Sequence, residues 1–161
     1  MSCLECGAPT RSRRETYRYD ECGLKNVVLS GIEVRRCTQC DNYDVSIPRM
    51  EQLHRLIALA IIEKESRLRG EEVRYLRSLL GWSGASLARH MGVADETVSR
   101  WENDATPIGP QADRLLRLIV ARDKLVRKYS MHRLARIDAK KATTLRMDFG
   151  TSQNQWMLLT A

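Results

Sequence analysis

Hydrophobic positions with helical spacing dominate the middle of the chain. After Pro48, apolar residues recur three and four positions apart, which predicts an amphipathic helix; they are Leu53, Leu56, Ile57, Ala60 and Ile61. A second helix, ended by Gly81, carries Val73, Leu76, Leu79 and Leu80. A long helix is predicted from Asp113 to Tyr129, with its apolar positions at Leu115, Leu116, Ile119, Val120 and Leu125.

Shorter segments before Pro48 have the composition of β-strands. Thr16 to Asp20, Asn26 to Arg36 and Tyr43 to Ile47 are rich in Tyr, Val, Leu and Ile, and Gly23 and Gly31 are predicted to break them. They are expected to form short antiparallel strands, with the helix after Pro48 covering one face of the sheet. The charged stretch from Glu63 to Gly70 is the predicted hinge between two halves.

The end of the chain alternates between apolar and polar residues. Leu145, Met147 and Phe149 alternate, Gly150 to Asn154 is rich in turn-forming residues, and the alternation resumes at Trp156. This pattern predicts a terminal β-hairpin.

The stretch from Gly84 to Asn103 has the pattern of a helix-turn-helix unit. Ser83 and Asp95 can cap two short helices, and Gly92 allows a left-handed turn between them. A steep helix crossing needs one small residue at the contact and apolar residues that hold the second helix down; these are Ala88, Val98 and Trp101. The alternative is an ordinary helical hairpin.

In such a unit the second helix enters the major groove of DNA. Its outward positions are Glu96, Thr97, Ser99, Arg100 and Asn103. Arg100 can pair with guanine or bind a phosphate, and Glu96 can accept a hydrogen bond from cytosine N4 or favour the helix N-terminus electrostatically. Ser86 and Arg89 on the preceding helix are candidate phosphate contacts, the alternative being a solvated surface.

Four of the five cysteines form two Cys-x-x-Cys pairs, Cys3 with Cys6 and Cys37 with Cys40. A two-residue gap lets both thiolates face one ion, and tetrahedral Zn²⁺ takes four such ligands. One structural zinc ion per chain is therefore predicted; rubredoxin-like iron and a redox dithiol are the alternatives. Cys22 is left over, either as a small apolar residue or as a reactive thiol.

Charge and composition favour a nucleic-acid partner. The formal net charge is +7, from 27 Lys and Arg against 20 Asp and Glu, and the surplus is largest in the last third of the chain. This favours a polyanion such as DNA, although a solvated basic tail would have the same composition. No apolar run is long enough to span a bilayer and no secretion signal is evident, so a cytoplasmic, non-membrane protein is expected.

The two cysteine pairs, together with the runs Gly23 to Val27 and Thr97 to Glu102, resemble the MqsA-like family of antitoxins and transcriptional regulators, which combine a zinc ribbon with an Xre-type helix-turn-helix domain. The resemblance covers roughly residues 1–127. It implies that the zinc domain meets an RNase toxin and that the helical domain dimerises on palindromic operator DNA. The base-reading Asn and Arg of the family map onto Glu96 and Arg100, so the Asn is replaced here.

The expected fold class is α+β, in three units. Residues 1–69 would form a small zinc-ribbon-like β domain with a long helix, residues 70–130 an all-α helix-turn-helix domain, and residues 131–161 an extension with a β-hairpin. The expected function is that of a dimeric, sequence-specific repressor with structural zinc. The alternative is an antitoxin that binds a toxin and autorepresses its operon. No catalytic motif is visible, so an enzyme is not expected.

Overall fold

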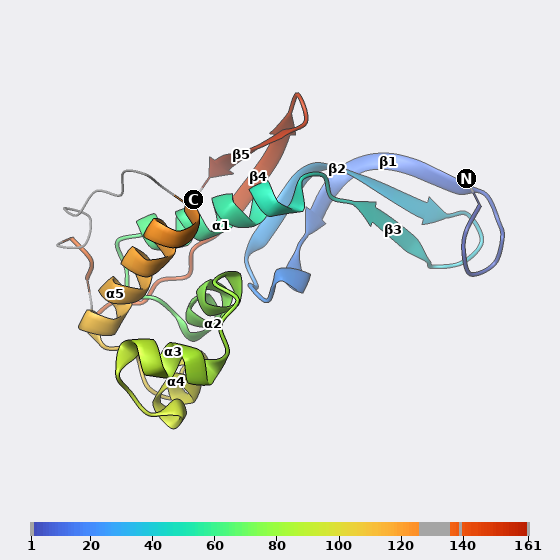
Figure 1. Ribbon diagram of the computed structural model, residues 1–161. Helices are drawn as coiled ribbons and strands as arrows, with labels where there is room; N and C mark the ends of the chain where they lie inside the picture. Colours follow the sequence, from blue (N-terminus) through green and yellow to red (C-terminus); the bar gives the residue numbers. More distant parts are fainter. Residues whose placement is uncertain (1, 126–135, 139, 161) are drawn as a thin grey trace.

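A mixed β-sheet and a group of helices pack on the two sides of one central helix (Figure 1). The computed structural model describes residues 2–125, 136–138 and 140–160. The strands are β1 (Thr10–Arg18), β2 (Val27–Cys37), β3 (Tyr43–Ser46), β4 (Met147–Ser152) and β5 (Gln155–Thr160). The helices are η1 (Asp20–Cys22), α1 (Met50–Glu63), α2 (Gly70–Leu79), α3 (Gly84–Met91), α4 (Asp95–Glu102), α5 (Pro110–Val120) and the π-helical η2 (Ala121–Leu125). The α+β fold class is confirmed.

Strand β2 is the centre of the sheet. It pairs along one side with β1, while its other side pairs first with β4, over Val27 to Ser30, and then with β3, over Glu33 to Arg36. Gly31 lies between the two partners at φ +72°, and the β1 register shifts opposite it. The sequence pattern predicts a break at Gly31, but the strand continues through this residue. Gly31 instead forms a bulge at which β2 changes partner.

The predicted strand Thr16 to Asp20 overlaps only the end of β1, which begins six residues earlier at Thr10 and ends at Arg18; Asp20 already belongs to η1. The outer halves of β1 and β2, with β3, form a ribbon that projects from the body of the molecule (Figure 1). Arg11, Arg13 and Arg14 are exposed there. Because this part of β1 has no buried face, its sequence shows no hydrophobic alternation to identify it.

The predicted C-terminal hairpin is present as β4 and β5, joined by a turn at Gln153 and Asn154. Both turn residues have positive φ, 48° and 60°, which is the conformation of a type I′ turn. Strand β4 pairs in parallel with β2, so the hairpin extends the N-terminal sheet. The sequence indicates the hairpin but not this partner, because a parallel pairing between distant segments leaves no local signal.

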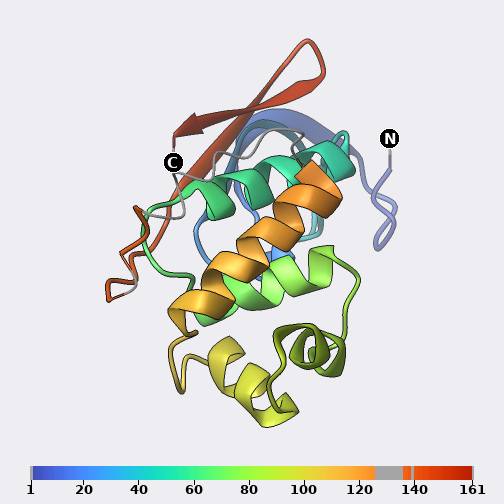
Figure 2. The same ribbon diagram turned by 60° about the vertical axis from the view of Figure 1, so that its left-hand side comes forward.

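The core is one continuous hydrophobic cluster that runs from the sheet through α1 to the other helices. Helix α1 lies on one face of the sheet, and α2 and α5 pack on its other side (Figure 2). Fully buried residues come from every layer, among them Leu29 and Phe149 of the sheet, Ile57 of α1, Leu76 of α2 and Leu116 of α5. This shared core argues against an independent folding of the two halves.

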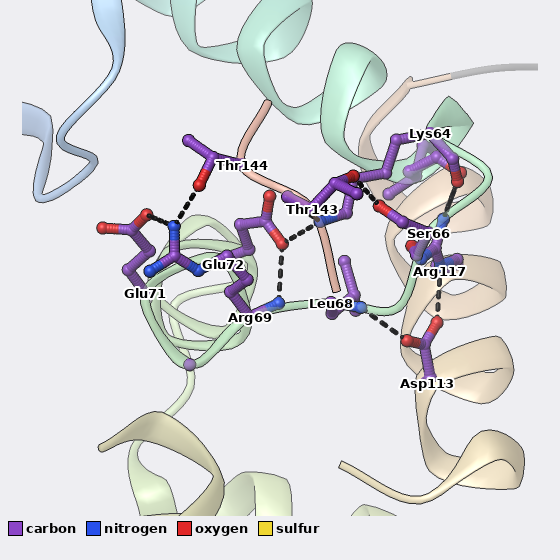
Figure 3. Close-up of polar contacts among 12 residues, drawn as sticks. Lys64, Ser66, Leu68, Arg69, Glu71, Glu72, Asp113, Arg117, Thr143 and Thr144 are labelled. Carbon is purple, nitrogen blue, oxygen red and sulfur yellow. Dashed lines mark hydrogen bonds and ion pairs between the residues drawn. The ribbon is translucent and has the colours of Figure 1, made fainter. Parts of the chain in front are cut away.

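A buried ion pair from α5 holds the segment between α1 and α2 (Figure 3). Arg117 is completely buried and binds Asp113 at 2.5 Å. Its guanidinium group also donates to three backbone carbonyl oxygens, those of Ile62 (3.1 Å), Lys64 (2.6 Å) and Ser66 (2.7 Å). Asp113 in turn accepts the backbone N–H of Leu68 at 2.8 Å.

A second buried pair fixes the start of α2. Lys64 Nζ lies 2.5 Å from Glu72 Oε2, and their side chains are 5% and 4% exposed. The same carboxylate accepts the backbone N–H of Arg69 at 2.7 Å, which caps the helix. The expectation of a hinge between Glu63 and Gly70 is therefore wrong, because the backbone of this segment is bound from both sides.

Helix α5 begins three residues before the predicted Asp113, at Pro110, whose fixed φ suits the first position of a helix. Regular α-helical geometry ends at Val120, and the chain continues as the π-helical turn η2. The rest of the predicted helix, residues 126–129, lies outside the described residues. Leu115, one of the apolar positions of the predicted helix, is 41% exposed.

Candidate metal centre and nucleic-acid interface

The two cysteine pairs meet in one cluster. The Sγ atoms of Cys3, Cys6, Cys37 and Cys40 all lie within 4.8 Å of one another. Three of the separations are 3.4, 3.5 and 3.7 Å. Four sulfurs placed about 2.3 Å from a tetrahedral ion would be about 3.8 Å apart. The four residues can therefore hold one metal ion, as the sequence predicts.

The backbone around the cluster prepares it for a cation. The amides of Cys6 and Glu5 hold the pKa of the Cys3 thiol at about 6, and Asn42 Nδ2 adds a contact at 3.6 Å. The backbone amide of Asn42 lowers the pKa of Cys40. The neighbouring thiols of Cys37 and Cys6 have the opposite effect, and the net result is a pKa raised to about 12. Like charges so close together need a positive ion between them, and a divalent metal supplies it.

Two tight loops bring the thiolates together. In the first loop, Gly7 adopts φ +73° and its N–H donates to the Cys3 carbonyl oxygen at 2.9 Å. In the second, the N–H of Cys37 donates to the carbonyl oxygen of Asn42 at 2.9 Å. Both loops lie at the far end of the projecting ribbon, near the N-terminus (Figure 1). None of the four cysteines belongs to the hydrophobic core cluster.

Cys22 takes no part in the cluster. Its thiol is half-buried and donates to the backbone carbonyl oxygen of Tyr19 at 3.0 Å. Burial raises its pKa to about 11, so the group stays protonated at neutral pH. Of the two roles considered for Cys22, packing as a small apolar residue fits this environment.

The position of the cluster predicts a local effect of metal loss. Cys37→Ser should reduce the bound metal from one ion per chain to none, while the unfolding midpoint of the body and its helical circular dichroism stay close to wild type. The reason is that the ligands lie outside the core. Metal analysis and thermal unfolding measure both. Cys22→Ser is the matched control and should keep the metal; a Cys37→Ser chain that loses its helices would contradict this assignment.

Helices α3 and α4 form a tight pair whose buried residues are those predicted. Ala88, Val98 and Trp101 are at most 7% exposed, and Gly92 ends α3 with φ +67°. Ser83 caps α3, since its hydroxyl accepts the backbone N–H of Ser86 at 3.1 Å. The prediction that Asp95 caps the next helix is wrong.

Ala94 occupies the capping position of α4, and Asp95 is the first residue of the helix, where its carboxylate still favours the N-terminus electrostatically.

The residues predicted to contact DNA lie on the outside of this pair. Glu96, Ser99, Arg100, Asn103 and Arg89 are exposed, and Ser86 and Thr97 are partly exposed. In the part of the chain that the structure describes, no partner is recorded for the side chains of Arg100 and Glu96. Asn103 is different, because it follows the end of α4 and its side chain binds the Ser99 carbonyl oxygen and Arg74, each at 2.9 Å.

The end of α4 is anchored to α2 by contacts that the sequence did not reveal. Arg77 Nε lies 2.5 Å from Glu102 Oε1, in a pair that is 17% and 10% exposed. Gly70 is so close to α4 that a Cβ atom there would lie 2.6 Å from the carbonyl oxygen of Trp101. The Gly70 N–H donates to Asp104 Oδ1 at 2.7 Å. Glu102, immediately after the buried Trp101, therefore holds α4 in place.

Comparison with known proteins adds no relative: no family model matches the chain, and neither a curated protein nor a solved structure is significantly similar to it. Among the described residues, no helix has both the length and the apolar character needed to cross a bilayer.

Proposed function

We propose that this protein is a sequence-specific DNA-binding regulator that inserts α4 into the major groove. The observation that carries the proposal is the α3–α4 pair, in which buried Ala88, Val98 and Trp101 leave Arg100 projecting from the opposite face. Helix α4 is eight residues long, which suits a helix that contacts a few base pairs. In this arrangement Arg89 and Ser86 of α3 approach the phosphates.

Arg100 has no ion-pair partner among the residues that the structure describes, which supports a role in recognition. An arginine that ends in solvent without a carboxylate partner keeps its donors available for guanine O6 and N7. By contrast, Arg74 and Arg77 of α2 are both paired with Glu102, so they stabilise the fold. Asn103 is likewise bound within the protein. Arg100, with Glu96, Thr97 and Ser99 beside it, is thus the centre of the proposed contact surface.

Replacing Arg100 distinguishes base reading from phosphate binding. If Arg100 reads guanine, Arg100→Ala should weaken binding to the selected operator by about 1–3 kcal/mol and relax specificity at one base pair per half-site. If it binds phosphate, the loss should be almost equal on all sequences, and the salt dependence should fall by about one counterion. Binding to selected and scrambled duplexes over a salt series measures both quantities.

Arg55→Ala is the control for net charge. Arg55 lies on α1 and pairs only with Glu51 among the described residues, at 2.6 Å on the surface. It should leave binding to both duplexes nearly unchanged. If a folded Arg100→Ala protein binds both duplexes like the wild type, α4 does not lie in the groove and the proposal fails.

We further propose that the metal is zinc and that its role is structural. Four thiolates fill a tetrahedral shell, so no coordination position is left for a substrate. Zinc also fits the short spacing within each cysteine pair. Metal analysis of protein purified without added metals tests this, and a red, iron-containing protein would exclude zinc.

An antitoxin role is the second candidate, and one observation favours it. The metal-bearing ribbon projects away from α3 and α4 (Figure 1), and Leu4, on its first loop, is 99% exposed. Because the ribbon extends away from these helices, its tip can contact a protein partner while α4 contacts DNA. Co-expression with the product of the neighbouring gene tests this role. A complex that is lost in Leu4→Asp would support it, whereas the absence of a complex would count against an antitoxin role and leave regulation of transcription as the proposed function.

A further inference from the structure

The last strand of the sheet exposes a run of apolar residues. Met157, Leu158 and Leu159 of β5 are 44%, 40% and 53% exposed, and they supply three of the seven large hydrophobic side chains that are exposed in the described part of the chain. Leu158 is on the same face as the buried Trp156, and Met157 and Leu159 are on the other. Consecutive exposed apolar residues on both faces of a strand indicate a surface that is covered in the functional assembly.

The backbone of β5 is also open to pairing. The strand order is β1-β2-β4-β5, so β5 is an edge of the sheet. Among the described residues, β5 pairs with β4 alone, and only the Trp156 N–H has a side-chain acceptor, Gln52 Oε1 at 3.4 Å. Proteins protect such edges with charged residues or prolines. β5, with the sequence Gln-Trp-Met-Leu-Leu-Thr, has neither.

We propose that β5 pairs antiparallel with β5 of a second copy of this chain, so that one continuous sheet crosses the dimer. An isologous interface must be complementary to itself, and an uncharged apolar strand meets this requirement without bringing like charges together. The β1 edge does not, because it exposes Arg11, Arg13, Arg14 and Arg18. The third edge, β3, is only four residues long and carries the exposed Asp44. Charge therefore selects the edge at which two copies join.

This inference goes beyond the proposed function, since it concerns the free protein and needs no DNA. Two surfaces could bind a second copy, the edge strand β5 and the surface of α5 around Leu115, and the inference selects β5. Leu115 of α5 is 41% exposed as well and offers a helical surface for a second copy, but it is a single apolar side chain. The six residues of β5 are fewer than the about 20–30 residues a side of a standard interface, so the dimer should dissociate on dilution.

Light scattering after size exclusion, over a dilution series without DNA, tests the proposal. The wild type should change from dimer to monomer on dilution, and Leu158→Lys and Leu158→Glu should each be monomeric throughout. Mixing these two variants should restore a dimer, because antiparallel pairing places the opposite charges near each other. Simple destabilisation of the fold would not produce this rescue.

Leu115→Lys is the matched control and should dimerise like the wild type. If Leu158→Lys lowers the unfolding midpoint, Leu159→Lys replaces it, since Leu159 is the more exposed of the two. A wild type that stays monomeric at every concentration would overturn the proposal. So would a dimer that Leu115→Lys dissociates and both β5 variants leave intact.

Discussion

Replacing Arg117 by Met should reduce the free energy of unfolding by about 3–5 kcal/mol, which is typical when one partner of a buried ion pair is removed. The substitution leaves Asp113 charged and buried, at 1% exposure, and takes the donor from three backbone carbonyl oxygens at the end of α1 and in the following segment. Denaturant unfolding, followed by circular dichroism, measures the change.

Arg55→Met is the control for Arg117→Met, because it removes an arginine of the same i,i+4 ion-pair spacing from the surface. It should cost at most about 0.5 kcal/mol. Arg117→Lys should fall between the two, since one ammonium group cannot reach all the acceptors of the guanidinium group. Equal unfolding midpoints for Arg117→Met and wild type would show that the segment between α1 and α2 is held by other contacts.

Gly70→Ala should also destabilise the protein strongly, lowering the free energy of unfolding by about 1–3 kcal/mol or more because the new methyl group overpacks the contact with α4. The new Cβ atom would lie 2.6 Å from the Trp101 carbonyl oxygen and 2.7 Å from that of Glu102. Both are backbone atoms, so the end of α4 has to move. Because α4 is the proposed recognition helix, the variant should also bind the operator more weakly at a temperature where it is still folded.

Gly84→Ala is the matched control for Gly70→Ala. Gly84 is likewise the first residue of a helix, but a Cβ atom there meets nothing within 4 Å. Because alanine favours helix more than glycine does, this variant should be neutral or stabilised by up to about 1 kcal/mol. If both alanine variants have wild-type stability and DNA binding, the close approach of α2 to α4 does not determine the position of α4.

The elements with a strong local pattern could be predicted from the sequence. The spacing of Leu53, Ile57 and Ile61 reveals α1, and the alternation around Phe149 reveals the terminal hairpin. The partners of these elements could not be predicted, because β2–β4 pairing joins distant segments. The network at Arg117 was also hidden: a buried arginine on a helix reads as a surface residue until its acceptors are known.

In the candidate sites, too, features with a local sequence pattern could be predicted, and features that depend on distant contacts could not. The metal ligands follow from the two Cys-x-x-Cys pairs, since both the residue type and the spacing are fixed by the ion. The outward face of α4 follows from the inward positions of Val98 and Trp101. The supports of α4 do not, because the contacts of Gly70 and Glu102 depend on how α2 crosses it. Asn103 was assigned to the DNA surface on helical spacing alone, although its side chain binds Arg74.

The parallel pairing of β2 with β4 has a consequence for biosynthesis. Val27 leaves the ribosome well before its neighbour in the sheet, Met147. Until β4 has been synthesised, the edge of β2 to which it binds stays unpaired, and an exposed strand edge of this kind invites aggregation. The two cysteine loops can close early, whereas the body must wait for β4 and β5. Folding of the body should therefore be slow, as expected for a sheet with such distant contacts.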